Sequence, residues 1–261
     1  MIGGRVIGGR LALRFLGHST LLVELDGLRL LTDPVLRSRL GPLRRQHPVP
    51  DLGRAAIDVV LISHLHHDHL DPPSLRSLFG RPLLVVPAGA ARHLRRRGFE
   101  VVHEMRAGET FAVAGVTLSA TAAIHSGARL PFGPFAEALG YVISGPAGRI
   151  YFAGDTDLFP GMADLGPVDI ALVPVWGWGP RLGRGHLDPE RAAQAVALIH
   201  PRYAVPIHWG TLWPMGMARV RGHRLREPPV EFAAAVRRLA PEVTVLVTAP
   251  GAAVVLPGTG S

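Results

Sequence analysis

The chain has 261 residues, 48% of them hydrophobic and 18% charged, so it is long and apolar enough to form one globular domain over residues 1–261. It contains no cysteine, which excludes disulfide bonds, a cysteine-ligated zinc and a cysteine nucleophile. The net charge of +8 comes from basic residues that are all arginine and mostly scattered, a pattern typical of codon bias in a GC-rich genome, so we expect no nucleic-acid partner.

The first part of the chain predicts the antiparallel start of a sheet. Residues 11–16, 20–25 and 28–31 alternate or run apolar, and Asp26-Gly27 between the last two is a hairpin signal. Pro34 follows directly after Asp33 and cannot donate to a strand ladder, so it ends the third strand. From about residue 35 to 55 we predict a loop without secondary structure, of a length that usually serves as a lid or rim.

The rest of the chain alternates predicted strands with predicted helices. Helices are expected at 71–79 and 188–200, with Asp71 and Asp188 as their N-caps, and at 88–97 and 229–239. The expected strands are 59–62, 83–86, 100–103, 111–113, 116–122, 139–143, 149–153, 168–174, 203–207 and 243–247. Strands and helices recurring in two similar halves predict an α/β protein, a four-layer αββα sandwich.

A cluster of metal-ligand side chains follows the apolar run at 59–62. His64, His66, Asp68 and His69 lie within six positions, and imidazole and carboxylate ligands suit a hydrolytic metal such as zinc. Because side chains alternate along an extended segment, His64 and His66 are expected to point the same way. A turn at Asp68-His69 would then direct a second pair to a neighbouring point. This arrangement suits two metal ions a few ångströms apart.

Three further polar residues, His125, Asp155 and His208, each come just after a predicted strand. Loops at strand ends are where α/β proteins place their chemistry, above a rigid scaffold. Their positions therefore make these three residues candidates for the chemistry of the protein.

The segment His64-Leu65-His66-His67-Asp68-His69 resembles the HxHxDH signature of the metallo-β-lactamase-fold hydrolases. Further segments occur in the order found in one branch of that family, the bacterial relatives of N-acyl-phosphatidylethanolamine phospholipase D and of ascorbate-phosphate lactonase. They are Leu16-Gly17-His18-Ser19-Thr20, Leu31-Thr32-Asp33-Pro34, Gly154-Asp155-Thr156, His186-Leu187-Asp188-Pro189-Glu190 and Ile207-His208-Trp209-Gly210-Thr211.

The resemblance implies the αββα fold and a site for two divalent metal ions. Carried over by residue, one ion would be held by His64, His66 and His125, a second by Asp68, His69 and His208, with Asp155 bridging them. Zinc is favoured by the type of ligand, and manganese or iron would fit similar sites. A water between the two ions would lose a proton near neutral pH and become the nucleophile.

The remaining polar residues of these segments receive supporting roles. The candidate catalytic residues are Asp68 and His186, and His186 is expected to face the metal centre and to stabilise an oxyanion or protonate a leaving oxygen. Asp33 is predicted to orient a ligand histidine rather than to bind metal. His18 either does the same or only packs, and His67 is expected to point away.

The expected pocket wall is apolar, with arginines that could meet an anion. The aromatic candidates are Trp176, Trp178, Phe132, Phe135, Trp209 and Trp213, and the arginines are Arg44, Arg45, Arg129 and Arg181. The segment Ser126-Gly127-Ala128-Arg129 follows His125 where the phospholipase-like relatives usually have Trp and an Arg-rich run, which puts a lipid substrate in doubt.

The expected function is a dinuclear metal-dependent hydrolase of an ester-like bond, either a phosphodiester or a lactone, in a small or lipid-like substrate. Two alternatives stay open: a nuclease of the same fold, which would need an additional nucleic-acid-binding domain or a basic exosite, and a non-catalytic ligand sensor that keeps the metal. An oxygen-reducing diiron enzyme is disfavoured because it would want Glu at the position of His66. No apolar run approaches the roughly 20 residues of a membrane span, so we expect a cytoplasmic protein of unknown oligomeric state.

Overall fold

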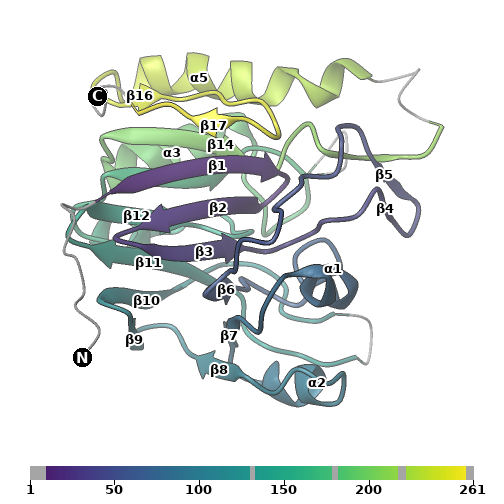
Figure 1. Ribbon diagram of the computed structural model, residues 1–261. Helices are drawn as coiled ribbons and strands as arrows, with labels where there is room; N and C mark the ends of the chain where they lie inside the picture. The colour runs from purple at the N-terminus through teal and green to yellow at the C-terminus, as the bar shows by residue number, and fades with distance from the viewer. Residues whose placement is uncertain (1–9, 130–132, 178–181, 217–221, 257–261) are drawn as a thin grey trace.

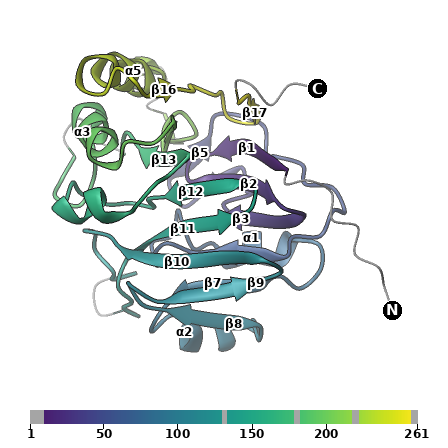
Figure 2. The same cartoon turned by 90° about the vertical axis from the view of Figure 1, so that its left-hand side faces the viewer.

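The fold is that of a computed structural model, which describes residues 10–129, 133–177, 182–216 and 222–256. Two seven-stranded sheets pack face to face with helices outside each of them (Figures 1 and 2). The first sheet has the order β17 (Ala253–Val254), β1 (Leu11–Gly17), β2 (Thr20–Leu25), β3 (Leu28–Thr32), β6 (Val59–Leu61), β7 (Leu83–Pro87) and β8 (Val102–Met105). The second has the order β16 (Thr244–Val245), β14 (Tyr203–Ile207), β13 (Ile170–Pro174), β12 (Gly148–Phe152), β11 (Leu139–Gly145), β10 (Val116–Ala122) and β9 (Thr110–Val113).

The alternation of apolar side chains divides the core between two faces of the first sheet. Phe15 and Leu21 point into the central core, where they join Ile143 and Leu172 of the second sheet. Side chains on the other face of the first sheet form a separate cluster with Leu75 of α1 (Pro72–Ser77) and Leu94 of α2 (Ala91–Arg95). The helices α3 (Pro189–Ile199) and α5 (Glu227–Leu239) cover the outside of the second sheet (Figure 2). The short helix η1 (Pro160–Asp164) contacts α3, and the short helix η2 (Gly222–Leu225) contacts α5. The predicted four-layer αββα sandwich is confirmed.

Local signals in the sequence placed several elements correctly. Asp26 and Gly27 both have positive φ, 53° and 89°, which is the conformation of a two-residue turn between antiparallel strands, here β2 and β3. Asp71 caps α1 by accepting from the Ser74 amide at 3.1 Å, and Asp188 caps α3 by accepting from the Arg191 amide at 2.8 Å. No helix among the described residues is long and apolar enough to cross a membrane.

The prediction of an unstructured loop at 35–55 was wrong. Within it β4 (Arg39–Leu40) and β5 (Leu43–Arg45) form a hairpin, and β5 pairs with β15 (Leu212–Pro214) to give a third, three-stranded sheet. The strands are too short to show an alternating pattern, and their pairing partner lies far away in the sequence. The C-terminal strand β17 was also missed. After β16 in the second sheet, the chain crosses to the first sheet, where β17 pairs with β1.

The direction of the strands brings their ends together. In the first sheet β1, β3 and β6 run the same way, because β2 is antiparallel to both β1 and β3 and β6 is parallel to β3. In the second sheet β10, β12, β13 and β14 also share one direction. The strands β1 and β3 point toward the side of the molecule that carries α1 and the β4–β5 hairpin (Figure 1).

Candidate metal centre

The predicted ligands follow the ends of these like-directed strands. His64 comes after β6, His125 after β10, Asp155 after β12 and His208 after β14. The remaining three, His66, Asp68 and His69, lie in the turn between β6 and α1. The structure brings all seven side chains to one place between the two sheets, as groups whose nitrogen and oxygen atoms lie within 4.8 Å of one another.

Three imidazoles form the first group. His66 Nδ1 lies 3.0 Å from His64 Nε2 and 3.1 Å from His125 Nε2. Burial lowers the pKa of each ring, that of His125 to about 4, so the three are neutral at neutral pH. Three neutral imidazole nitrogens directed at one point match a divalent metal better than they match one another as hydrogen-bond partners.

The second group differs from the first in containing a carboxylate. Its members are Asp68, His69, His208 and His18. Asp68 Oδ2 lies 3.8 Å from His69 Nε2 and 3.9 Å from His208 Nε2. Asp155 lies between the two groups: its Oδ2 is 3.3 Å from both His69 Nε2 and His208 Nε2, and 4.0 Å from His125 Nε2. This position is the one that a bridging carboxylate requires.

Unsatisfied polar atoms show that this donor set fits metal ions. Among the described residues His69 Nε2, His208 Nε2 and Asp155 Oδ1 are buried and have no hydrogen-bond partner. Buried polar atoms in native proteins nearly always have a hydrogen-bond partner. Several unpartnered atoms that face one point therefore need an explanation, and a bound metal ion provides one. Imidazole nitrogen and carboxylate oxygen are the ligands that zinc and similar divalent ions take.

The outer nitrogens of the ligand rings are held by specific acceptors. Asp33 is fully buried and accepts from His69 Nδ1 at 2.7 Å and from the Ser63 hydroxyl at 2.5 Å. Because the Ser63 proton goes to Asp33, its Oγ is free to accept from His64 Nδ1 at 2.9 Å. His125 Nδ1 likewise donates to the Gly185 carbonyl at 2.7 Å. In the neutral form of each ring these bonds place the proton on the outer nitrogen, so that Nε2 is the atom directed toward the candidate metal position.

A single buried carboxylate thus orients one histidine of each group. Asp33 acts on His69 directly, in line with its predicted role of orienting a candidate ligand, and on His64 through Ser63, which was not predicted. Ser63 was not assigned a role from the sequence, although its place directly before the first ligand is the signal that could have suggested one. The Gly185 carbonyl carries no sequence signal, since every residue has a carbonyl group.

His18 contacts the same centre from the first strand. Its Nε2 lies 3.0 Å from Asp68 Oδ2 and its ring centroid 3.9 Å from that of His208. Burial, together with the neighbouring His208, lowers the pKa of His18 to about 3, so its neutral ring donates to the Asp68 carboxylate. Of the two predicted roles for His18, these contacts favour orientation of a ligand over simple packing.

Backbone conformation also marks this centre. His18, Asp33 and His208 have positive φ values of 59°, 32° and 63°, which side chains with a Cβ adopt at a cost. The turns after β1 and β14 support each other: the His208 amide donates to the His18 carbonyl at 2.8 Å, and Thr211 Oγ1 accepts from the His18 amide at 2.7 Å. Such strain persists where surrounding contacts enforce it, as they do here.

Metal binding by the free protein should release protons. Burial alone would lower the pKa of His69 and His208, but Asp155 and the other nearby carboxylates outweigh it and raise both pKa values, that of His69 well above its ordinary value. Both rings therefore hold a proton at neutral pH until a metal ion displaces it, so affinity should rise with pH through neutrality. Zinc titration by calorimetry at pH 7, in two buffers of different ionisation enthalpy, should show release of more than one proton per chain; equal heats in the two buffers would contradict this.

The structure corrects several predicted pocket residues. Arg45 is buried and its guanidinium donates to the carbonyls of Leu16 and Val35, so it is not free to bind an anion. Arg129 donates to the carbonyls of Leu65 and Leu70 at 2.6 and 3.0 Å. It therefore stabilises the turn between β6 and α1 that carries candidate ligands.

Three of the aromatic candidates are buried, and two of them, Trp176 and Trp209, line a cavity of about 10 Å³, which is too small for a substrate. Trp176 stacks on Trp213 with ring centroids 5.2 Å apart, and Trp209 Nε1 donates to the Pro206 carbonyl. Phe135 is 62% exposed. Arg44 is exposed on β5, and the predicted candidates Phe132, Trp178 and Arg181 lie outside the described residues.

His186 and His67 take different positions around the centre. His186 Nε2 lies 3.8 Å from Asp155 Oδ2, and its ring meets that of His125 edge-on with centroids 4.7 Å apart. Its side chain is 28% exposed, so it faces the centre from the solvent side, as predicted. His67 turns to Arg129, whose Nη2 lies 2.9 Å from its Nδ1, and it is absent from the metal-ligand groups found among the described residues.

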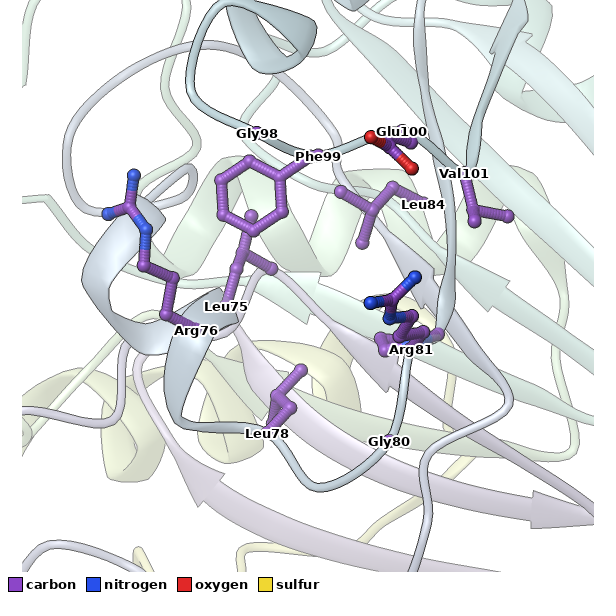
Figure 3. A pocket seen from close by; sticks show the side chains of 11 residues that line it. Leu75, Arg76, Leu78, Gly80, Arg81, Leu84, Gly98, Phe99, Glu100 and Val101 are labelled. Carbon is purple, nitrogen blue, oxygen red and sulfur yellow. The ribbon is translucent and has the colours of Figure 1, made fainter.

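Two cavities differ in their relation to this centre. One, of about 550 Å³, is lined by Asp68 and His67 on one side and by the β4–β5 hairpin on the other. The other, of about 240 Å³, lies between α1 and the start of β8, where Arg76 and Arg81 flank a floor of Leu75, Leu78 and Phe99 (Figure 3). None of the candidate ligands lines the smaller cavity, so the larger one is the candidate substrate site.

Comparison with known proteins agrees with this geometry. Residues 28–209 match the family described as the beta-lactamase superfamily domain. The chain is 33% identical to a UPF0173 metal-dependent hydrolase of Methanopyrus kandleri, over 91% of this chain and 96% of that protein. The chain belongs to the metallo-β-lactamase-fold family of metal-dependent hydrolases.

Two further members of the family show how far the similarity extends. N-acyl-phosphatidylethanolamine-hydrolyzing phospholipase D 1 of Caenorhabditis elegans is 32% identical over 77% of this chain, which spans 64% of that protein. Igni18, a metallo hydrolase from the archaeon Ignicoccus hospitalis, has a solved structure that superposes with a TM-score of 0.72 at 25% identity, covering 94% of this chain and 97% of Igni18. These matches confirm the family and the fold that the sequence motifs predicted.

Proposed function

We propose that this metallo-β-lactamase-fold protein is a dinuclear hydrolase that cleaves an ester-like bond, a phosphodiester or a lactone. The observation that carries the proposal is the position of Asp155, whose carboxylate lies within 4.0 Å of imidazole nitrogens from both groups, two of which, His69 Nε2 and His208 Nε2, have no hydrogen-bond partner. The similarity to the phospholipase D of C. elegans supports phosphodiester chemistry.

The proposed ligands are those predicted from the sequence: His64, His66 and His125 for one ion, Asp68, His69 and His208 for the other, and Asp155 for both. When bound, two divalent ions, zinc by ligand type, supply a hydroxide at neutral pH and polarise the bond to be cleaved.

The residues of the chain have separate tasks in this scheme. Asp68 is 16% exposed and lines the cavity, so its carboxylate is placed to accept the proton of the attacking water, while His18 holds it in position. His186 Nε2 faces the centre from the open side, where it can donate a hydrogen bond to the oxyanion or to the leaving oxygen.

The test is turnover by metal-reconstituted protein of bis(p-nitrophenyl) phosphate and of a panel of small lactones, with a His66→Ala, Asp155→Ala double variant alongside. Phosphodiester turnover that is lost in the variant would support the phosphodiesterase form of the proposal, and lactone turnover alone would support the lactonase form. Two bound metal ions without turnover of either substrate would contradict the proposal and favour a sensor.

Replacing His186 should separate catalysis from metal binding. His186→Ala is expected to lower kcat by about a hundredfold, the usual contribution of a general acid, and to leave two metal ions bound. The measurement is kcat on the preferred substrate together with metal content by elemental analysis. Loss of a metal ion in this variant would instead show that His186 is a ligand.

A further inference from the structure

The larger cavity has a preformed apolar wall that faces the metal centre. Its volume of about 550 Å³ lies within the range of ordinary ligand sites. Asp68 lines one side, so a molecule in the cavity reaches the second group of metal ligands. The opposite side is built from Leu40, Leu43 and Pro214. The cavity therefore joins a hydrolytic centre to an apolar surface.

The fold holds this wall in place. The β4–β5 hairpin pairs with β15 through Leu43 and Pro214, and Leu40 is buried in a small cluster with Val35 and Leu212. The buried guanidinium of Arg45 connects the hairpin to the end of β1 through the Leu16 carbonyl. An apolar surface that is already ordered does not lose conformational freedom when a ligand covers it, so it gains affinity at low cost.

One cation lies in the same cavity. Arg37 lines it, and its Nε lies 3.1 Å from Asp71 Oδ2, while its side chain stays 41% exposed. Within the described parts of the chain its two terminal guanidinium nitrogens have no hydrogen-bond partner. Asp71 is itself occupied as the N-cap of α1, so this ion pair fixes the direction of Arg37. A held guanidinium with free donors is suited to a phosphate or carboxylate.

We propose that this cavity selects anionic esters with an apolar group: Arg37 meets the anionic group, and Leu40, Leu43 and Pro214 cover the apolar one. The inference rests on the proposed function and names the substrate class of the same site. It also names Arg37 as the arginine that binds the anionic group. The guanidiniums of Arg45 and Arg129 cannot do so, because they donate to backbone carbonyls. Small neutral lactones would use only the metal centre and not the cavity.

The test compares two non-hydrolysable probes, methylphosphonate and butylphosphonate, by calorimetric binding to the metal-loaded protein. The wild type should bind butylphosphonate more tightly by about fourfold for each added methylene, as burial of apolar groups predicts. Leu43→Trp, or Pro214→Trp on the neighbouring strand, should fill the cavity and bring the two affinities close together. Equal affinity of the wild type for both probes would overturn the apolar assignment.

The charge is tested by Arg37→Gln, which keeps a donor for Asp71 but removes the cation. This variant should bind both phosphonates about tenfold more weakly and preserve their ratio, because a charge-assisted hydrogen bond is lost. Arg39→Ala, which removes an exposed arginine of the same hairpin outside the cavity, is the matched control and should change neither affinity. Unchanged phosphonate binding by Arg37→Gln would overturn the role of Arg37. If the proposed function is wrong, the wild type will show no turnover. The ratios of phosphonate affinity do not depend on turnover, so the two failures can be told apart.

Discussion

Asp155→Ala is expected to reduce the metal content from two ions per chain to at most one and to lower kcat/KM by at least about a thousandfold. Asp155 Oδ2 lies within 4.0 Å of ring nitrogens from both ligand groups, so it is placed to hold the two proposed ions at a fixed separation. Without it the positive charge of a second ion has no shared counterion. The measurements are elemental analysis after dialysis and steady-state kinetics on the preferred substrate.

Folding and catalysis must be separated in this variant, because removing a buried charge that faces imidazoles costs about 3–5 kcal/mol of stability. Asp155→Asn keeps the shape and serves as the second variant, with circular dichroism to establish that it is folded. Asp164→Ala is the matched control, since Asp164 is an exposed aspartate of η1 and belongs to none of the ligand groups. Two tightly bound ions in a folded Asp155→Asn protein would show that the carboxylate is not the bridge.

Removal of the metal by a chelator should abolish turnover and lower the melting temperature by about 10 °C. A ligand present at about a thousand times its Kd stabilises a fold by about 4 kcal/mol, and each kcal/mol shifts Tm by about 2–4 °C in a protein of this size. The physical reason lies in the buried atoms His69 Nε2, His208 Nε2 and Asp155 Oδ1, which lose their proposed partner when the ions leave. Differential scanning calorimetry with and without chelator measures the shift.

Re-addition of each metal alone makes the experiment specific. Zinc should restore both Tm and turnover, and manganese or iron should do so in proportion to their affinity for imidazole and carboxylate ligands. Calcium, which prefers sites made entirely of oxygen ligands, is the matched negative control and should restore neither. A melting temperature unchanged by the chelator, with the metal shown to be gone, would mean that the centre forms without ions and that its unpaired atoms need another explanation.

The candidate ligands could be proposed from the sequence because their chemistry is local in it. His64, His66, Asp68 and His69 lie within six positions, and His125, Asp155 and His208 each follow a segment whose apolar pattern predicts a strand. Both the position of these residues after strands and the ligand type of their side chains therefore indicate a functional site. The order of the motifs along the chain then identified the family and with it the αββα fold.

The substrate cavity could not be predicted because its parts depend on pairing between distant segments. Arg37 and the β4–β5 hairpin lie in a stretch that has no strand pattern of its own, and the hairpin is ordered by β15, more than 150 residues later. The sequence suggested Arg45 and Arg129 as anion-binding residues, but tertiary contacts turn both guanidiniums onto backbone carbonyls. Which arginine stays free is decided by what surrounds it, and composition carries no information about that.

The sequence by itself therefore determined the layered fold and the family and supplied the candidate ligands, since periodic apolar runs and adjacent residues of metal-ligand type are local properties. Only the tertiary structure decided that Asp33 orients both His69 and, through Ser63, His64, because that hydrogen-bond chain joins β3 to the turn after β6. It likewise decided which cavity faces the metal centre. Hydrogen bonds and cavity walls form between segments that meet only when the two sheets pack together, and that meeting is a property of the folded chain.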